Sequence, residues 1–83
     1  MPYISQDKRE SLNDGTPPLT PGELNYVITR TIDRFLGPRP TYLDINDAIG
    51  VLQCASYEVY RRVAAPYEDK KCAKNGDVYQ ERD

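Results

Sequence analysis

One helix with clear start and stop signals constrains the fold of this chain most. The segment Thr20-Pro21-Gly22-Glu23 has the form of a helix N-terminus: an N-cap threonine, a proline at the first helical position and a glutamate three residues after the cap. The segment Gly37-Pro38 marks the other end, because glycine favours the position after a helix and proline does not continue one. We therefore predict a helix over residues 20–37.

The apolar residues of this helix recur at the period of an amphipathic helix and cover one arc: Leu24, Val27, Ile28, Ile32, Phe35 and Leu36. The opposite arc carries Tyr26, Thr29, Arg30, Asp33 and Arg34. We therefore expect the apolar arc to be the buried face. Asn25 lies at the border of that arc, where its amide either reaches water or binds a loop or a ligand.

A second helix is predicted over residues 41–65, with Thr41 as its cap, Asp44 as a capping partner and Pro66 as its end. Its main apolar face is formed by Ile45, Ala48, Ile49, Leu52, Ser56, Val59 and Val63. On its other side, Gly50 and Cys54 form a groove of small residues where a second helix can approach. The alternative is that Gly50 is merely tolerated, at about 1 kcal/mol relative to alanine.

The two flanking segments complete the predicted fold. Residues 1–19 read as an extended arm, because Pro17-Pro18 stops a helix, and Tyr3 with Ile4 either frays or packs onto the helices or a neighbouring subunit. Residues 66–83 form a charged tail, which we expect to be ordered through Val78 and Tyr79. A short third helix over Lys70–Lys74, before the turn dipeptide Asn75-Gly76, is an alternative for part of this tail. The prediction is a single all-α domain over residues 1–83: a small antiparallel helical hairpin with an N-terminal arm and an ordered C-terminal tail.

The small size of the chain predicts self-association. A domain of 83 residues buries a modest share of its surface and usually needs disulfides, a metal or oligomerisation. The two cysteines form no recognisable disulfide framework, and the chain has no histidine and no CxxC pair for a metal site. A homo-oligomer is therefore expected.

Charge and composition argue against several classes of function. The 11 basic and 13 acidic residues are mixed along the chain and form no basic stripe, which argues against DNA or RNA as a partner. The sequence has no apolar run that would span a membrane and no signal peptide, so we expect a soluble, cytoplasmic protein. Without histidine or acidic pairs on facing helices, we expect neither an enzyme nor a cofactor.

The end of the second helix and the tail combine tyrosines with cations. Tyrosine rings stack on bases, and arginine and lysine bind phosphates, so a small anionic nucleotide is one candidate ligand. The same residue types are favoured anchors of protein interfaces, and the sequence alone does not separate the two possibilities. The candidate residues, besides Asn25, are Tyr57, Arg61, Arg62, Tyr67, Lys70, Lys71 and Tyr79.

The segments GELNYVITRTIDRFLG (22–37), INDAIGVLQCASYEVYRRV (45–63) and APYEDKKCAKNGDVY (65–79), with the opening MPYI, resemble an uncharacterised family of small phage and prophage proteins. The resemblance implies a phage setting in the host bacterial cytoplasm, where compact helical proteins often act by binding. It suggests an oligomeric protein that sequesters a small anionic nucleotide signal of bacterial immunity. The alternatives are an adaptor that inhibits a host protein and a small nucleotide hydrolase.

Overall fold

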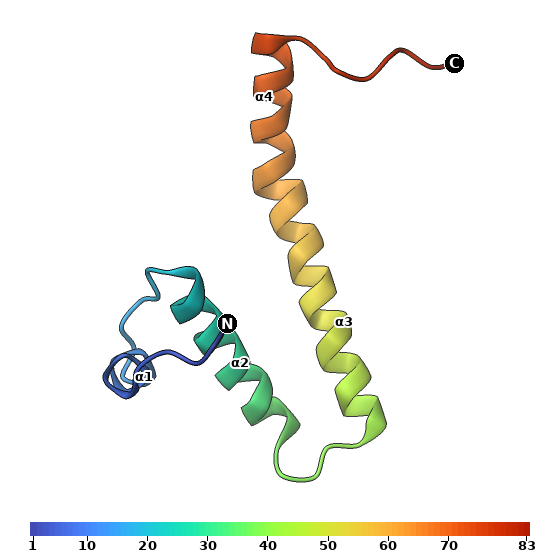
Figure 1. The fold of residues 1–83 in the computed structure, drawn as a ribbon. Helices are drawn as coiled ribbons and strands as arrows, with labels where there is room; N and C mark the ends of the chain where they lie inside the picture. Colours follow the sequence, from blue (N-terminus) through green and yellow to red (C-terminus); the bar gives the residue numbers. More distant parts are fainter. The chain divides into compact units, whose positions relative to one another are not determined.

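The computed structural model describes residues 1–83 and contains helices but no strands (Figure 1). The α-helices are α1 (Gln6–Asn13), α2 (Pro21–Leu36), α3 (Tyr42–Val59) and α4 (Ala65–Asn75), and a π-helical segment η1 (Tyr60–Ala64) joins α3 to α4. The all-α prediction is confirmed. The chain divides into two compact units, Met1–Ala48 and Ile49–Asp83. The antiparallel hairpin stays a prediction.

Helix α1 lies within the segment that was predicted to be an extended arm, so that prediction is wrong for Gln6–Asn13. The Ser5 hydroxyl caps the helix by accepting a hydrogen bond from the Lys8 backbone N–H (3.4 Å), and Asp7 lies in its first turn. Gly15, with a φ of 103°, follows the last turn. The two prolines therefore come after a helix that has already ended, and they do not prevent it.

The core of the first unit lies between α1 and α2. Leu12 of α1 and Tyr26 of α2 are each 7% exposed. The Tyr26 hydroxyl donates a hydrogen bond to Oδ1 of Asn13 (3.0 Å), and the Arg9 guanidinium carbon lies 5.9 Å from the centre of the Tyr26 ring. The buried ring thus has a partner for its polar end and a cation over its face.

This core corrects the expected orientation of α2. The predicted buried arc is exposed at Leu24 (50%) and Phe35 (59%), whereas Tyr26, on the arc predicted to face solvent, is buried. The reason is that α1 packs against the tyrosine side of α2, where the aromatic ring supplies a large apolar area. The apolar arc of α2 is only partly covered: Val27, Ile32 and Leu36 are half-buried, and Leu24, Ile28 and Phe35 are exposed.

The predicted start of α2 is confirmed in atomic detail. The Thr20 hydroxyl accepts a hydrogen bond from the Glu23 backbone N–H (3.1 Å). The Glu23 carboxylate in turn accepts from the Leu19 backbone N–H (3.2 Å) and from the Thr20 hydroxyl (3.1 Å). Glu23 is only 8% exposed, so these two bonds satisfy a buried charge. Gly37, with a φ of 68°, ends α2 as predicted.

The first four residues fold back onto α2. A Cβ atom added to Gly22 would lie 3.3 Å from Cγ2 of Ile4, and the Arg9 side chain donates a hydrogen bond to the Ile4 carbonyl (2.9 Å). Ile4 therefore packs onto the helices, which confirms that alternative over a frayed terminus. Tyr3 does not, since it is 75% exposed.

The second predicted helix begins where expected and ends later than expected. The Thr41 backbone N–H donates to the Asp44 carboxylate (3.0 Å), and the Asp44 N–H donates to the Thr41 hydroxyl (3.1 Å). The end at Pro66 is wrong, because α4 includes Pro66 and continues to Asn75. The helical chain is unbroken from Tyr42 to Asn75.

The π-helical segment explains how the helix passes Pro66. In an α-helix, the proline ring clashes with the carbonyl four residues earlier, which here belongs to Arg62. In η1 the backbone widens, and the Ala65 N–H bonds to the Tyr60 carbonyl, five residues earlier. This extra residue in the turn moves the conflicting carbonyl away from the ring, so the chain stays helical.

The predicted tail is therefore helical over its first ten residues. Gly76, with a φ of 93°, ends α4, and its N–H bonds to the Cys72 carbonyl (2.9 Å). The residues after Gly76 form no helix or strand. The expected anchoring by Val78 is wrong, because its side chain is 93% exposed.

Candidate interaction surface

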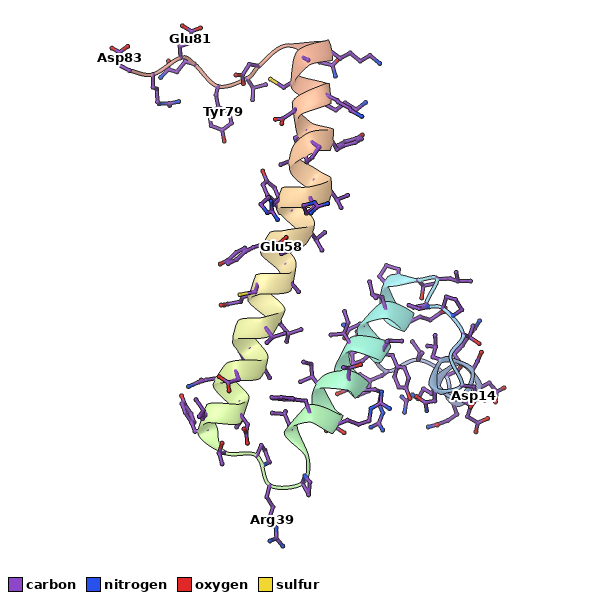
Figure 2. All side chains as sticks on the ribbon, turned by 180° about the vertical axis from the view of Figure 1, so that it is seen from behind. Asp14, Arg39, Glu58, Tyr79, Glu81 and Asp83 are labelled. Carbon is purple, nitrogen blue, oxygen red and sulfur yellow. The ribbon has the colours of Figure 1, made fainter.

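The helical stretch Tyr42–Asn75 is exposed along almost its whole length. Ala48 is its only buried residue. Figure 2 shows side chains standing out on every side of α4. A helix with apolar residues on all sides is typical of one that is covered by other chains. The exposed large apolar residues are Tyr42, Leu43, Ile45, Ile49, Val51, Leu52, Tyr57, Val59, Tyr60, Val63 and Tyr67.

Seven residues on one face follow the spacing of a coiled coil. Their separations alternate between three and four residues over three heptads, which keeps them on one stripe of the helix. We call this stripe the seam, and it consists of Tyr42, Ile45, Ile49, Leu52, Ser56, Val59 and Val63. The last seam residue, Val63, lies within η1, and the extra residue of the π turn moves the side chains that follow to another face.

The groove of small residues lies on the other side of α3 from the seam. A Cβ atom added to Gly50 would meet no atom within 4 Å, and Cys54 is exposed. This surface is therefore open within the chain. Its predicted contact with another chain stays a prediction.

A groove of about 560 Å³ lies at the C-terminal end of α4. Its lining residues come from η1, α4 and the following segment: Tyr60, Glu68, Asp69, Lys71, Cys72, Asn75, Gly76, Asp77, Val78 and Tyr79. Three carboxylates face a single lysine, so the local potential favours cationic groups over phosphates. The Tyr79 side chain lies on the segment after α4 (Figure 2).

The structure brings only some of the predicted site residues together. Lys71 and Tyr79 line the same groove, and the Lys71 Nζ lies 5.6 Å from the centre of the Tyr67 ring. Arg61 instead binds Glu58 at 2.8 Å, an exposed ion pair of the kind that contributes little stability. Neither Arg61 nor Arg62 lines the groove at the end of α4.

The remaining predicted residues are separate. Tyr57, Arg62 and Lys70 are exposed on the helix. Asn25 belongs to α2 in the first unit, where its Oδ1 accepts a hydrogen bond from the Thr29 hydroxyl (2.9 Å).

Eight residues of the groove were not among the predicted site residues: Tyr60, Glu68, Asp69, Cys72, Asn75, Gly76, Asp77 and Val78. The helix was predicted to end at Pro66. Residues before and after the proline were therefore not expected on one helix face. A signal was present, because residues 67–74 contain no glycine or further proline before the turn dipeptide Asn75-Gly76. A proline in the first turn of a continued helix is compatible with that pattern.

The structure contains neither a candidate metal site nor a candidate membrane-crossing helix. No three His, Cys, Asp or Glu side chains gather in an arrangement that could hold a metal ion. None of the helices combines the length and the apolar character that a membrane-crossing helix requires.

A family model described as "Domain of unknown function (DUF6899)" matches residues 1–78. The chain belongs to this family. The match includes all four α-helices and η1, and it ends one residue before Tyr79. The predicted relationship to an uncharacterised family is thereby confirmed. Comparison with curated proteins found no match, and comparison with solved structures found none either.

Proposed function

We propose that this member of the DUF6899 family is a homo-oligomeric helical adaptor that binds and inhibits a host protein during phage infection. Its contact surface is the helical stretch Tyr42–Asn75. The observation that carries the proposal is that this stretch buries one side chain, Ala48, and exposes large apolar side chains along its length. The phage setting is supported by the resemblance of the sequence blocks described above.

The size and shape of the exposed surface favour protein partners. Full burial of a valine, leucine or isoleucine side chain contributes about 1.5–3 kcal/mol. The aliphatic seam residues are 37–66% exposed, so covering them yields part of that amount at each position. Association of two proteins must offset roughly 4–15 kcal/mol. A partner that covers several seam positions at once meets this requirement, whereas a small molecule covers one or two.

A second surface stays accessible when the seam is covered. Tyr57 and Arg61 lie outside the seam and are exposed on the same helix. Tyrosine and arginine are enriched among the residues that dominate binding energy at protein interfaces. We therefore assign self-association to the seam and host-protein binding to the tyrosine and arginine side chains beside it.

Sequestration of a small anionic nucleotide is the second candidate. It is supported by the stacked pair of Lys71 over Tyr67 and by the exposed cations Arg61 and Arg62. Because the carboxylates of the α4 groove repel phosphates, a nucleotide would have to be held by cations outside this groove. No observation favours the hydrolase alternative over these two.

Two substitutions test the self-association. Val51 and Val59 are both 61% exposed and lie on the same helix, but only Val59 belongs to the seam. Val59→Asp is expected to raise the dimer dissociation constant at least about tenfold, or 1.4 kcal/mol, because it places a charge in the apolar contact. Val51→Asp is the matched control and should leave the constant unchanged. Sedimentation velocity measures both, and a wild-type chain that is monomeric at tens of micromolar overturns the proposed self-association.

The host partner is tested by affinity capture from infected cells, followed by mass spectrometry of both protein and small molecules. The adaptor proposal expects a stoichiometric host polypeptide with the wild-type chain and its loss with Arg61→Ala, while the oligomeric state stays unchanged. Arg82→Ala, in the segment after α4, is the control. A retained nucleotide without a stoichiometric polypeptide would instead support sequestration.

A further inference from the structure

We propose that the groove at the C-terminal end of α4 binds an arginine-bearing segment of another protein. The groove has a volume of about 560 Å³, and all of its lining residues belong to the second unit, Ile49–Asp83. None of them belongs to the seam, and neither Tyr57 nor Arg61 is among them. The inference is therefore independent of the proposed self-association and of the proposed adaptor surface.

The groove carries three carboxylates that have no cation partner. They belong to Glu68, Asp69 and Asp77, and the only basic residue of the lining is Lys71, which leaves a net charge of −2. Both ion pairs of the structure involve other residues. The Lys71 ammonium group lies 5.6 Å from the centre of the ring of Tyr67, which is not part of the lining. The groove therefore lacks the positive charge that would balance its carboxylates.

The end of α4 adds to the negative potential of the groove. Asn75 is the last residue of the helix, and it lines the groove together with Gly76. The carbonyl groups at a helix C-terminus act as about half a negative charge. Lys74, the basic residue of the last turn, does not line the groove. The helix end and the carboxylates thus favour a ligand of the same sign, a cation.

The two tyrosines of the groove favour a guanidinium group over other cations. Tyr60 comes from η1 and Tyr79 from the segment after α4, and both are exposed. A guanidinium group stacks on an aromatic ring and donates two parallel hydrogen bonds to a carboxylate. An ammonium group is a strongly hydrated point charge without that planar shape. Arginine therefore fits this combination of rings and carboxylates better than lysine does.

The segment after α4 is held in a turn that leaves an acceptor free. The Gly76 N–H donates to the Cys72 carbonyl (2.9 Å), and the Tyr79 N–H donates to Oδ1 of Asp77 (2.9 Å). The second carboxylate oxygen of Asp77 accepts no hydrogen bond within the chain and is available to a ligand.

The exposure of the groove favours a protein segment over a free small cation. The groove carboxylates are exposed, and a single exposed ion pair contributes little binding energy. A segment with more than one arginine makes several such contacts for one loss of translational freedom. We therefore assign the groove to an extended segment that presents neighbouring arginines.

Two-dimensional amide NMR of the full-length chain tests the inference. The probe is the end-blocked peptide Gly-Arg-Gly-Arg-Gly, whose two arginines lie on the same side of an extended chain. We expect saturable shifts at Asp77 and Tyr79, with a dissociation constant of about 1 mM or below at low salt. The same peptide with citrulline in place of arginine keeps the shape, loses the charge and should not bind. Absence of saturable shifts with the arginine peptide overturns the inference.

Two matched substitutions locate the binding site. Asp69→Asn and Asp47→Asn remove the same charge from exposed helical positions, but only Asp69 lines the groove. Asp69→Asn should weaken binding of the arginine peptide roughly two- to fivefold, whereas Asp47→Asn should not change it. Asp69→Asn combined with Asp77→Asn should weaken it about tenfold. Asparagine at position 77 keeps the side-chain oxygen that accepts from the Tyr79 N–H. Equal effects of the two single substitutions would indicate attraction to the overall charge and overturn the assigned site.

Spermidine distinguishes a free cation from a protein segment. It carries several ammonium groups but no guanidinium group, so at the same ionic strength it should bind more weakly than the arginine peptide. Spermidine that binds the groove as tightly as the peptide, or more tightly, would assign the groove to free polyamines and overturn the proposed occupant.

Discussion

The two compact units differ in whether a second helix covers the first. In Met1–Ala48, helix α1 packs on α2, and the buried residues are Leu12, Glu23, Tyr26 and Ala48. In Ile49–Asp83, no residue is buried, although the unit carries comparable apolar side chains. An apolar helix face needs another element to cover it. Within one chain, such an element is present only in the first unit.

This contrast has a consequence for folding. Isolated helices gain most of their stability from packing and are marginal in water when little else supports them. The first unit has such packing within one chain. If the second unit obtains it from another copy, as we propose, its helix content should depend on protein concentration, whereas that of the first unit should not.

The largest predicted effect separates the two units at Tyr26. Tyr26→Ala removes the largest buried side chain of the first unit, and truncation of a buried aromatic residue costs roughly 3–5 kcal/mol. We expect α1 to detach from α2, seen as fast amide hydrogen exchange over Gln6–Asn13, while exchange over α4 stays unchanged.

Tyr26→Phe is the matched control for this prediction. It keeps the ring and removes only the hydrogen bond to Asn13, which contributes about 1 kcal/mol. Equal exchange rates for the two variants would show that the hydrogen bond, and not the buried ring, holds α1 in place. A loss of protection in α4 would show that the two units do not fold independently.

The second prediction concerns Pro66 in the unit without a core. Pro66→Ala restores a backbone N–H and removes the ring, which together cost up to about 3 kcal/mol in a helix interior. The π segment should revert to an α-helix and rotate α4 by about 100° relative to α3. We expect the helix content of the monomer, measured by circular dichroism at low concentration, to rise.

The same variant distinguishes the seam from the α4 groove. All seam residues except Val63 lie in α3, before η1, so the dissociation constant of the oligomer should change by less than about threefold, or 0.7 kcal/mol. The groove should be lost, because Tyr60 leaves the face of Glu68 and Cys72. A drop in helix content would show that Pro66 is not the cause of the π segment.

The sequence predicted the helix limits well where capping residues act locally. Thr20 with Glu23, Thr41 with Asp44, and Gly37 each determine an end through contacts within a few residues, and the structure has all of them. The helix end predicted at Pro66 was wrong because the effect of a proline depends on whether the preceding turn widens. That widening is a property of the whole helix and not of the dipeptide.

The choice of buried face was less predictable. Hydrophobic periodicity ranked the arc of Leu24 and Phe35 above the side of Tyr26, yet α1 covers Tyr26. Hydrophobic periodicity indicates which face of a helix is suited to burial. It does not indicate which other helix of the chain can pack there. The candidate site was hard to predict for a similar reason, since Tyr60 lines one groove with Lys71 and Tyr79 only because the helix continues past Pro66. For Asn25, the sequence contained no signal of its bond to Thr29 beyond their spacing.

The smallest predicted effect compares the two helix caps. Replacing an N-cap threonine by alanine costs about 0.5–2 kcal/mol. Thr41→Ala should fall at the low end, because its capping partner Asp44 can still accept from the Thr41 backbone N–H and no charge is buried deeply. Thr20→Ala should fall at the high end, because it also removes one of the two donors to the buried Glu23 carboxylate. Amide exchange at the first turns of α2 and α3, measured side by side, tests the difference. Equal losses of protection would mean that the burial of Glu23 adds nothing to the cap of α2.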